Sequence, residues 1–464
     1  MKALRFVPLL VLAACAHGGA EPPVMAPEGQ SAIVQPRSVA DLTPTPAPKP
    51  FSYVANTTAN TIGKFAETEN GNEAPVATLG GTTTKLSSPT AVALDASGKI
   101  YAPNGNNTIT VYPAGASGNM APLKTISCGG LNHPSALALD ASGNLYVANR
   151  SGNSVSIFSS SAVNCVSGNR IIVGTNTGLA APNGILEASG KIFVANQSGN
   201  SVTEYAAGAS GDASPVAKIF GSLTKLHFPA GITVDVQAHL FVANNTGITV
   251  YSAGAVNDAA PLRTIAGAST LITDALNVGV SITGRTFVTD KSNAVLVFAA
   301  NANGNVAPSQ RVIGTMTELS MPEGLNLFEP LQTVGIRLSG EASFTDPTYG
   351  FVLAYFDGLT STTSQIVHVT AGDRVVFKNV DSSLPHTLSF LNDATTTTAN
   401  FPAGFDGSST ASIAGTSIGA THFSTGALNP NQQSTIYYAA PGLFTVGCAF
   451  HYDSSHMRTV IVSK

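Results

Sequence analysis

The chain has 464 residues, a formal net charge of −4 and 10% charged residues, with 45 glycines and 27 prolines. It contains no basic cluster, so nucleic acid is not an expected partner. It also contains no run of 18 apolar residues, so the sequence predicts no membrane-spanning helix. Short runs of β-branched and aromatic residues, many turn residues and no sustained helical periodicity predict an all-β protein of two or three domains.

The N-terminus has the outline of an export signal. Two cations, Lys2 and Arg5, precede a short apolar stretch that ends in Leu-Ala-Ala-Cys at Cys15. This segment resembles a bacterial lipoprotein signal, which implies a signal peptide at residues 1–14 and lipidation of Cys15. An ordinary signal peptide cleaved nearby is the alternative. Because Ala16 stands where aspartate would favour the inner membrane, the resemblance implies a periplasmic or cell-surface protein, with the outer membrane preferred.

Residues 15–50 are rich in proline, as in TPTPAPKP, and contain little that could pack in a core. Such a composition is typical of an extended linker. With a lipid on Cys15, we expect this segment to serve as a tether between the membrane and the folded part.

From residue 51 the sequence repeats. The motifs YVAN, YAPN, YVAN, FVAN, FVAN and FVTD begin at 53, 101, 146, 193, 241 and 287, with steps of 48, 45, 47, 48 and 46 residues. Each period has room for four strands, which is typical of a β-propeller blade. The first copy, FSYVAN, lacks a leading strand, and a spare one, MPEGLNLF, follows the last copy at 321–328. Pairing these two segments closes a ring of six blades. The repeat resembles NHL-type propellers over residues 51–331.

The propeller shows no clear catalytic set. Its histidines are His133, His227 and His239, and we expect its recurrent acids to hydrogen-bond blade turns instead of forming one site. Those acids are Asp95, Asp140, Glu187 and Asp235. The other notable pair is Cys128 and Cys165, 37 residues apart. In an exported protein this spacing is compatible with a disulfide, and two buried thiols are the alternative.

Residues 332–464 follow a different pattern. AGDRVVFKN, PHTLSF, GALNP, PGLFTVGC and MRTVIV occur in that order. Together they resemble the plastocyanin and pseudoazurin family of cupredoxins, which implies a Greek-key β-sandwich with one type 1 copper. The alternative is a β-sandwich that binds no copper and has the cysteine in its core.

The donor residues also suit copper on chemical grounds. One thiolate, two imidazoles and a thioether form the His₂Cys site with a weak axial methionine that is used for electron transfer. The expected ligands are His386, Cys448, His451 and Met457. The segment from His451 to Met457 is one residue longer than the family pattern, and His456 is an alternative axial ligand. A structural zinc site would need further cysteine or histidine pairs, which the sequence lacks.

These features predict an envelope-anchored electron carrier, not an enzyme, with unidentified redox proteins as partners and the propeller as docking or scaffold domain. By resemblance, the electron would pass through the edge of His451. Nitrous oxide reductase also joins a propeller to a cupredoxin, but its binuclear centre needs two loop cysteines, and this loop has only Cys448. Two alternatives remain: a propeller-based binding protein whose copper serves sensing or storage, and a propeller hydrolase with an accessory copper domain.

Overall fold

The computed structural model describes the propeller and part of the C-terminal region. In the propeller it covers residues 51–328 except Ala96, Cys128, Ala141, 163–169 and Ile282. Beyond residue 328 it covers 331–336, 344–346, 350–352, 366–369, 374–379, 385, 387, 389–390, 413–414, 417–418, 424–434, 437–439, 442–447 and 458–463. Within these residues no helix has the length and apolar character that crossing a bilayer requires.

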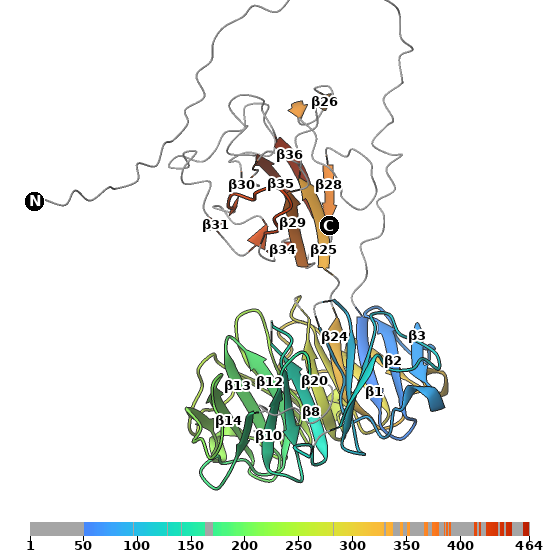
Figure 1. The fold of residues 1–464 in the computed structure, drawn as a ribbon, viewed down its shortest axis with the longest axis vertical. Helices are drawn as coiled ribbons and strands as arrows, with labels where there is room; N and C mark the ends of the chain where they lie inside the picture. The colour runs from blue at the N-terminus through green and yellow to red at the C-terminus, as the bar shows by residue number, and fades with distance from the viewer. Residues whose placement is uncertain are drawn as a thin grey trace, which may run out of the picture. The chain divides into compact units, whose positions relative to one another are not determined.

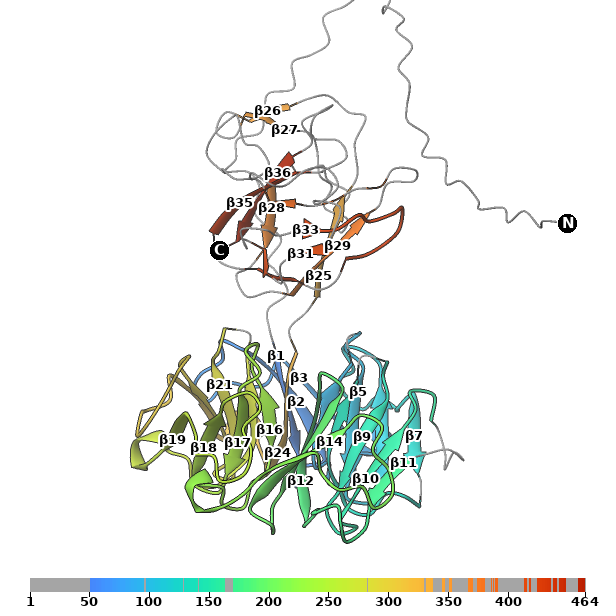
Figure 2. The same cartoon turned by 90° about the vertical axis from the view of Figure 1, so that its left-hand side faces the viewer.

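Residues 51–328 form six antiparallel sheets of four strands each, arranged as blades around an axis (Figures 1 and 2). The first two sheets are β24-β1-β2-β3 (Pro322–Phe328, Phe51–Asn56, Thr61–Ala66, Ala77–Gly80) and β4-β5-β6-β7 (Ala93–Leu94, Ile100–Asn104, Thr108–Tyr112, Lys124–Ser127). The next two are β8-β9-β10-β11 (Pro134–Leu139, Leu145–Asn149, Ser154–Phe158, Arg170–Val173) and β12-β13-β14-β15 (Pro182–Ala188, Lys191–Asn196, Ser201–Ala206, Ala217–Ile219). The last two are β16-β17-β18-β19 (Ile232–Val234, Leu240–Asn244, Gly247–Tyr251, Arg263–Ala266) and β20-β21-β22-β23 (Ala275–Val280, Thr286–Asp290, Ala294–Phe298, Gln310–Ile313).

The ring closes between the two ends of the propeller sequence. Strand β24 pairs antiparallel with β1, from Phe51 opposite Phe328 to Asn56 opposite Pro322. The predicted closure and the count of six blades are therefore confirmed. Strand β24 is the inner strand of the blade that also contains β1, β2 and β3. Backbone hydrogen bonds between β24 and β1 therefore join the last strand of the propeller to its first.

Apolar side chains between neighbouring blades form the core. In one cluster Tyr53 and Ala55 of β1 pack with Ile100 and Ala102 of β5 in the next blade. All four are less than 5% exposed. Strand residues alternate between the two faces of a sheet, so each blade buries both of its faces against its neighbours. A single blade could not cover these faces, which is why the repeat must close into a ring.

The recurrent acids mostly hydrogen-bond their own turns, as expected. The Asp140 carboxylate accepts hydrogen bonds from the backbone nitrogens of Ser142 and Asn144 at 2.9 and 2.8 Å, and from the Tyr146 hydroxyl at 3.2 Å. The turns at Asp95 and Asp235 are built in the same way. Each aspartate therefore fixes a turn between the first two strands of its blade.

Glu187 hydrogen-bonds its own turn, as expected, but it lies in strand β12 and not in the turn itself. In the β12–β13 ladder Glu187 lies opposite Ile192. The corresponding pair in the preceding blade is Leu139 opposite Leu145, so Glu187 has the position of Leu139 and not that of Asp140. The turn that follows is shorter and has Ser189 and Gly190 at φ of 52° and 73°. Glu187 Oε1 accepts a hydrogen bond from the Gly190 nitrogen at 2.9 Å. Glu187 is also one of the residues that line the cavity on the propeller axis.

Replacing Asp140 with alanine should destabilise the propeller by about 1–2 kcal/mol at neutral pH, because several donors lose a charged acceptor. Burial alone would raise the pKa of Asp140, but hydrogen bonds from Asn144, Ser142 and Tyr146 outweigh it and lower the pKa. A lowered folded-state pKa means stabilisation that is present at neutral pH and lost as the pH falls through that pKa. Urea unfolding of both proteins at neutral and acidic pH measures this. A stability difference that stays constant on acidification would contradict the account.

Four short 3-10 helices follow outer strands of the propeller: η2 (Thr82–Thr84), η3 (Ser222–Thr224), η4 (Ala268–Thr270) and η5 (Thr315–Thr317). In each, the threonine hydroxyl at the third residue donates to the carbonyl of the preceding glycine, as Thr84 does to Gly81 at 2.6 Å. These turns lie at the junctions between blades.

The C-terminal strands form further sheets. A four-stranded sheet has the order β25-β29-β34-β32 (Leu331–Ile336, Arg374–Asn379, Tyr437–Ala439, Ser417–Ile418). A six-stranded sheet has the order β28-β36-β35-β30-β33-β31 (Ile366–Val369, Arg458–Ser463, Gly442–Gly447, Ser389–Phe390, Ser424–Thr425, Ile413–Ala414). Strands β26 (Phe344–Asp346) and β27 (Gly350–Val352) pair with each other. This part of the chain is therefore also β, as the sequence predicts.

Candidate functional site

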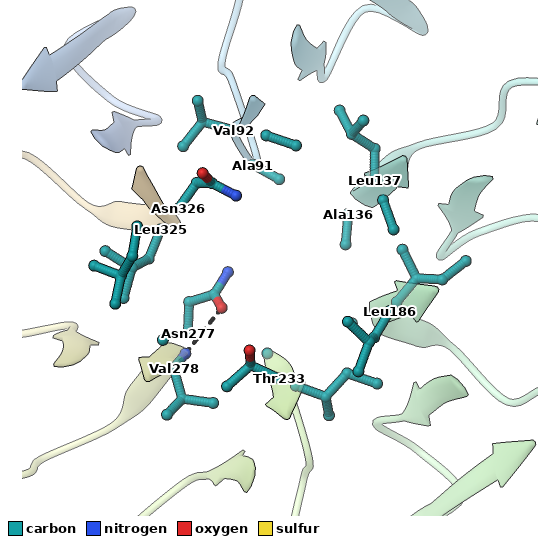
Figure 3. A pocket seen from close by; sticks show the side chains of 18 of the residues that line it. Ala91, Val92, Ala136, Leu137, Leu186, Thr233, Asn277, Val278, Leu325 and Asn326 are labelled. Carbon is teal, nitrogen blue, oxygen red and sulfur yellow. Dashed lines mark hydrogen bonds between the residues drawn. The ribbon is translucent and has the colours of Figure 1, made fainter. Parts of the chain in front are cut away.

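The axis of the propeller contains a cavity of about 260 Å³ (Figure 3). The inner strands of the six blades line it, mainly with alanine, valine, leucine, isoleucine and glycine. Thr233, Asn277 and Asn326 contribute polar groups among the side chains drawn around the axis. Glu187 is the one carboxylate among these lining residues, and its Oε1 accepts a hydrogen bond from the Gly190 nitrogen. The lining residues that the structure describes include no histidine, cysteine, lysine or second carboxylate to act with it, so they provide little for acid–base or nucleophilic chemistry.

Three glycines at the inner strands, Gly184 in β12, Gly324 in β24 and Gly231 directly before β16, allow neighbouring blades to approach each other closely. A Cβ atom on Gly184 would lie 2.1 Å from the Ala230 carbonyl oxygen, and one on Gly324 would lie 2.6 Å from Ala91 Cα. At Gly231 the obstacle would be the Asn277 side chain, 2.2 Å away. These positions need glycine because the neighbouring blade occupies the space of a side chain.

Changing Gly184 to alanine should destabilise the propeller by about 1–3 kcal/mol, because the new methyl group meets fixed backbone of the next blade. Gly208→Ala is a matched control, since a Cβ there meets nothing within 4 Å and the residue does not have a positive φ. Thermal and urea unfolding of both variants measure the difference. Equal stability of the two variants would show that the inner ring tolerates expansion.

The two channel asparagines were not anticipated from the sequence. Asn277 Nδ2 donates to the Glu323 carbonyl at 3.3 Å, and its Oδ1 accepts from the Val278 nitrogen at 2.8 Å. Asn277 therefore links two blades next to the channel. Both asparagines stand where the early blades have alanine: Asn277 matches Ala136, and Asn326 matches Ala138, by strand register. The replacement of alanine by asparagine in ALNVGV and MPEGLNLF was the feature of the sequence that could have identified these two positions.

The three propeller histidines lie on separate turns. His133 Nδ1 is 3.2 Å from the Ser151 hydroxyl, and His239 Nδ1 is 2.8 Å from Asp235 Oδ2. The His227 ring packs edge-on against Phe228. In the part of the chain that the structure describes, no three His, Cys, Asp or Glu side chains come together in a group able to hold a metal.

All predicted copper ligands lie outside the described residues: His386, Cys448, His451 and Met457. The predicted lipidation site Cys15 and the predicted disulfide partners Cys128 and Cys165 lie outside them as well. The copper site, the lipidation and the disulfide therefore stay predictions.

The strands that lead to the copper ligands are described. In the six-stranded sheet Gly447, the last residue of β35, lies opposite both Ser389 of β30 and Arg458 of β36. Ser389 begins β30 and Arg458 begins β36. Because both partners run antiparallel to β35, the start of β30, the end of β35 and the start of β36 lie side by side at one end of the sheet.

Buried hydrogen bonds fix this region. The hydroxyls of Ser389 and Ser424 are 2.9 Å apart, both residues are fully buried, and the Tyr437 hydroxyl donates to the Ser424 carbonyl at 3.1 Å. Asn379 Nδ2 donates to the Leu428 carbonyl at 2.8 Å. Satisfied buried polar groups such as these hold strand ends in one arrangement.

Comparisons with known proteins give little beyond architecture. No family model matches the chain, and no curated protein matches it. Among solved structures, a streptogramin B lyase has a TM-score of 0.36 and 12% identity, covering 49% of this chain and 70% of that one. A nidogen/laminin complex gives 0.45 and 14%, covering 60% and 98%. A protein of unknown function from Bacteroides caccae gives 0.46 and 10%, covering 60% and 99%. At such scores no family or activity follows, and what stands is an all-β chain with a six-bladed propeller.

Proposed function

We propose that this protein is a single-copper electron carrier of the cell envelope, with a cupredoxin-type sandwich as the redox domain and the propeller as docking or scaffold domain. The observation that carries the proposal is the alignment of Ser389, Gly447 and Arg458 in one row across the six-stranded sheet. Gly447 and Arg458 directly adjoin two predicted copper ligands, Cys448 and Met457, and Ser389 lies three residues after a third, His386.

Chain connectivity supports the convergence of the ligands. Cys448 directly follows Gly447, and Met457 directly precedes Arg458. Adjacent strands lie about 4.8 Å apart and consecutive Cα atoms about 3.8 Å apart, so the thiolate and the thioether start from neighbouring points. His386 is three residues before Ser389, the first residue of β30, which is the strand next to β35. His451 belongs to the segment between β35 and β36. The residues present therefore fit a His₂Cys site with an axial methionine.

Copper bound by this donor set would supply one-electron redox chemistry. The task of the protein is then to hold the ligands nearly fixed, because a rigid site changes little between oxidation states. Thr387, next to His386, and Ser389 are fully buried, and the Ser389 hydroxyl is linked to Ser424 on β33. These contacts anchor the chain on the C-terminal side of His386 to the sheet.

The N-terminal features complete the proposal. Lipidation of Cys15 and a tether over residues 15–50 would keep the carrier at the membrane surface, with the outer membrane preferred. The propeller offers a broad surface made of six similar blades, and its channel has the apolar lining described above. Docking or scaffolding suits such a domain better than substrate turnover does.

Protein-film voltammetry of the full chain, loaded with one equivalent of Cu(II), tests the electron-carrier function. We expect a reversible one-electron wave whose amplitude follows copper content and whose electron exchange is fast. Tight copper binding without fast electron exchange would overturn the carrier proposal and favour copper storage or sensing.

A further inference from the structure

Neighbouring blades are joined by a repeated side-chain clamp. After an outer strand comes a glycine, and an Asn or Asp from the next blade packs against it. The Oδ1 atom of that residue accepts a hydrogen bond from the backbone nitrogen two residues after the glycine, at 2.7–2.8 Å. The clamp pairs are Gly81–Asn119, Gly174–Asp212, Gly221–Asp258, Gly267–Asn305 and Gly314–Asn72.

The two members of each clamp lie closer than side chains normally do. A Cβ built on the glycine would stand 2.6–3.0 Å from the Cβ of the partner Asn or Asp. The glycines have φ between 113° and 140°, a region that other residues rarely adopt. Each clamp therefore combines a glycine backbone with a close approach of two blades.

The junction between β7 and β11 has cysteines at both clamp positions. In every clamp the glycine stands two residues after the buried aliphatic residue of the outer strand, such as Ile219 before Gly221. Two residues after Ile126 of β7 stands Cys128. The clamp partner stands five residues before the next outer strand, as Asp212 does before Ala217. Five residues before Arg170, the first residue of β11, stands Cys165.

This junction also differs from the clamped ones in its loop. Each clamp glycine begins a Gly-x-x-Thr turn that leads to a leucine or isoleucine two residues later, as in Gly81 to Leu86. The segment from Cys128 to Leu131 is two residues shorter and has no threonine. The Thr84, Thr177 and Thr224 carbonyls accept hydrogen bonds from tyrosines of the next blade. Phe158 has that position in the blade that contains β11, and Phe298 and Phe65 have it at the clamped junctions of Gly267 and Gly314, so the shorter loop is what sets this junction apart.

Described contacts bring the two cysteine-bearing segments together. Lys124 Nζ on β7 donates to the carbonyls of Ser160 and Ala162, both at 3.0 Å. The Ser156 hydroxyl of β10 donates to the Gly130 carbonyl at 2.6 Å. Residues on either side of Cys128 thus contact the blade that carries Cys165, three residues after Ala162.

We propose that a Cys128–Cys165 disulfide replaces the glycine–Asx clamp at this junction. The Cβ separations of the clamps are shorter than the roughly 3.5–4.5 Å of a disulfide, and the φ of the clamp glycines does not suit cysteine, so a disulfide at these positions needs a wider junction and a different local backbone. The bond forms by exchange with a protein disulfide: the two thiols lose two protons and two electrons, and the donor disulfide is reduced to a dithiol. The disulfide would covalently join the two blades at the junction whose sequence has neither the Gly-x-x-Thr turn nor an Asn or Asp at the partner position.

Peptide mapping tests the bond directly. The full chain, purified without reductant, is unfolded in urea with iodoacetamide and digested. We expect one linked species that contains Cys128 and Cys165 and is lighter by two hydrogen atoms than the sum of its peptides. It should separate on reduction. Alkylation of both cysteines before reduction, or a link from either one to Cys448, would overturn the proposal.

Unfolding measurements test the register. Reductant should lower the thermal midpoint of the wild-type propeller by roughly 5–15 °C. The double variant Cys128→Ser with Cys165→Ser should show a similar loss without reductant. Adding reductant should then change the midpoint of this variant no further. Cys128→Gly with Cys165→Asn supplies the residues of the other clamps and should be more stable than the double serine variant. Equal stability of these two variants would contradict the equivalence with the clamps.

Discussion

Replacing Cys448 with serine should abolish the intense visible absorption expected of the copper-loaded protein. That absorption depends on a thiolate bound to Cu(II), and a serine hydroxyl cannot take its place. Titration of the purified full chain with Cu(II), followed by visible spectroscopy, measures the effect. The loss should be complete, whereas the propeller should unfold at an unchanged urea concentration, because Cys448 is not part of residues 51–328.

His456→Ala provides the matched control within the same segment. The proposal assigns the axial position to Met457, so the alanine variant should keep the visible band. Loss of the band in His456→Ala with retention in Met457→Ala would assign the axial position to the histidine. An identical spectrum of the wild type and Cys448→Ser would remove the copper assignment altogether.

Changing Val54 to aspartate should unfold the propeller or nearly so. Val54 on β1 is fully buried and packs with Phe65, Leu325 and Val295, on the strands that close the ring and on the neighbouring blade. An uncompensated charge there should cost about 3–5 kcal/mol, a large share of the stability of a typical domain. Far-UV circular dichroism with urea unfolding measures the loss.

Ala59→Asp is the control for this substitution. Ala59 lies in the turn between β1 and β2 and is exposed, so the added charge remains in water and stability should change by less than about 0.5 kcal/mol. If Val54→Asp were as stable as the control, the packing of Val54 between the closing blade and its neighbour would not be needed for the stability of the propeller.

The sequence predicted the propeller well because its constraint repeats. Six copies of one motif placed the second strand of each blade, and the missing strand before Phe51 matched the extra strand that ends at Phe328. The sequence did not reveal that Glu187 lies in a strand, because its spacing to Ile192 equals that from Asp140 to Leu145, although the β12–β13 ladder continues further into the turn. Spacing alone does not reveal which residues of a hairpin pair and which form its turn.

Contacts between blades were harder to predict. The glycine–Asx clamps join residues 37–38 positions apart along the chain, or 242 across the ring closure. Each clamp becomes visible only when adjacent blades are superimposed in register. The same holds for Asn277, whose partner Glu323 belongs to the next blade. The copper ligands, in contrast, were predicted from residue chemistry and from the order of the motifs. The described strands β30, β35 and β36 fix the ends of the segments in which these ligands lie.

Copper K-edge X-ray absorption of the full chain with one equivalent of copper tests the central proposal most directly. The account predicts one short copper–sulfur bond from Cys448 together with two imidazole nitrogens from His386 and His451. A copper environment of nitrogen and oxygen alone, or one unchanged in Cys448→Ser, would contradict it.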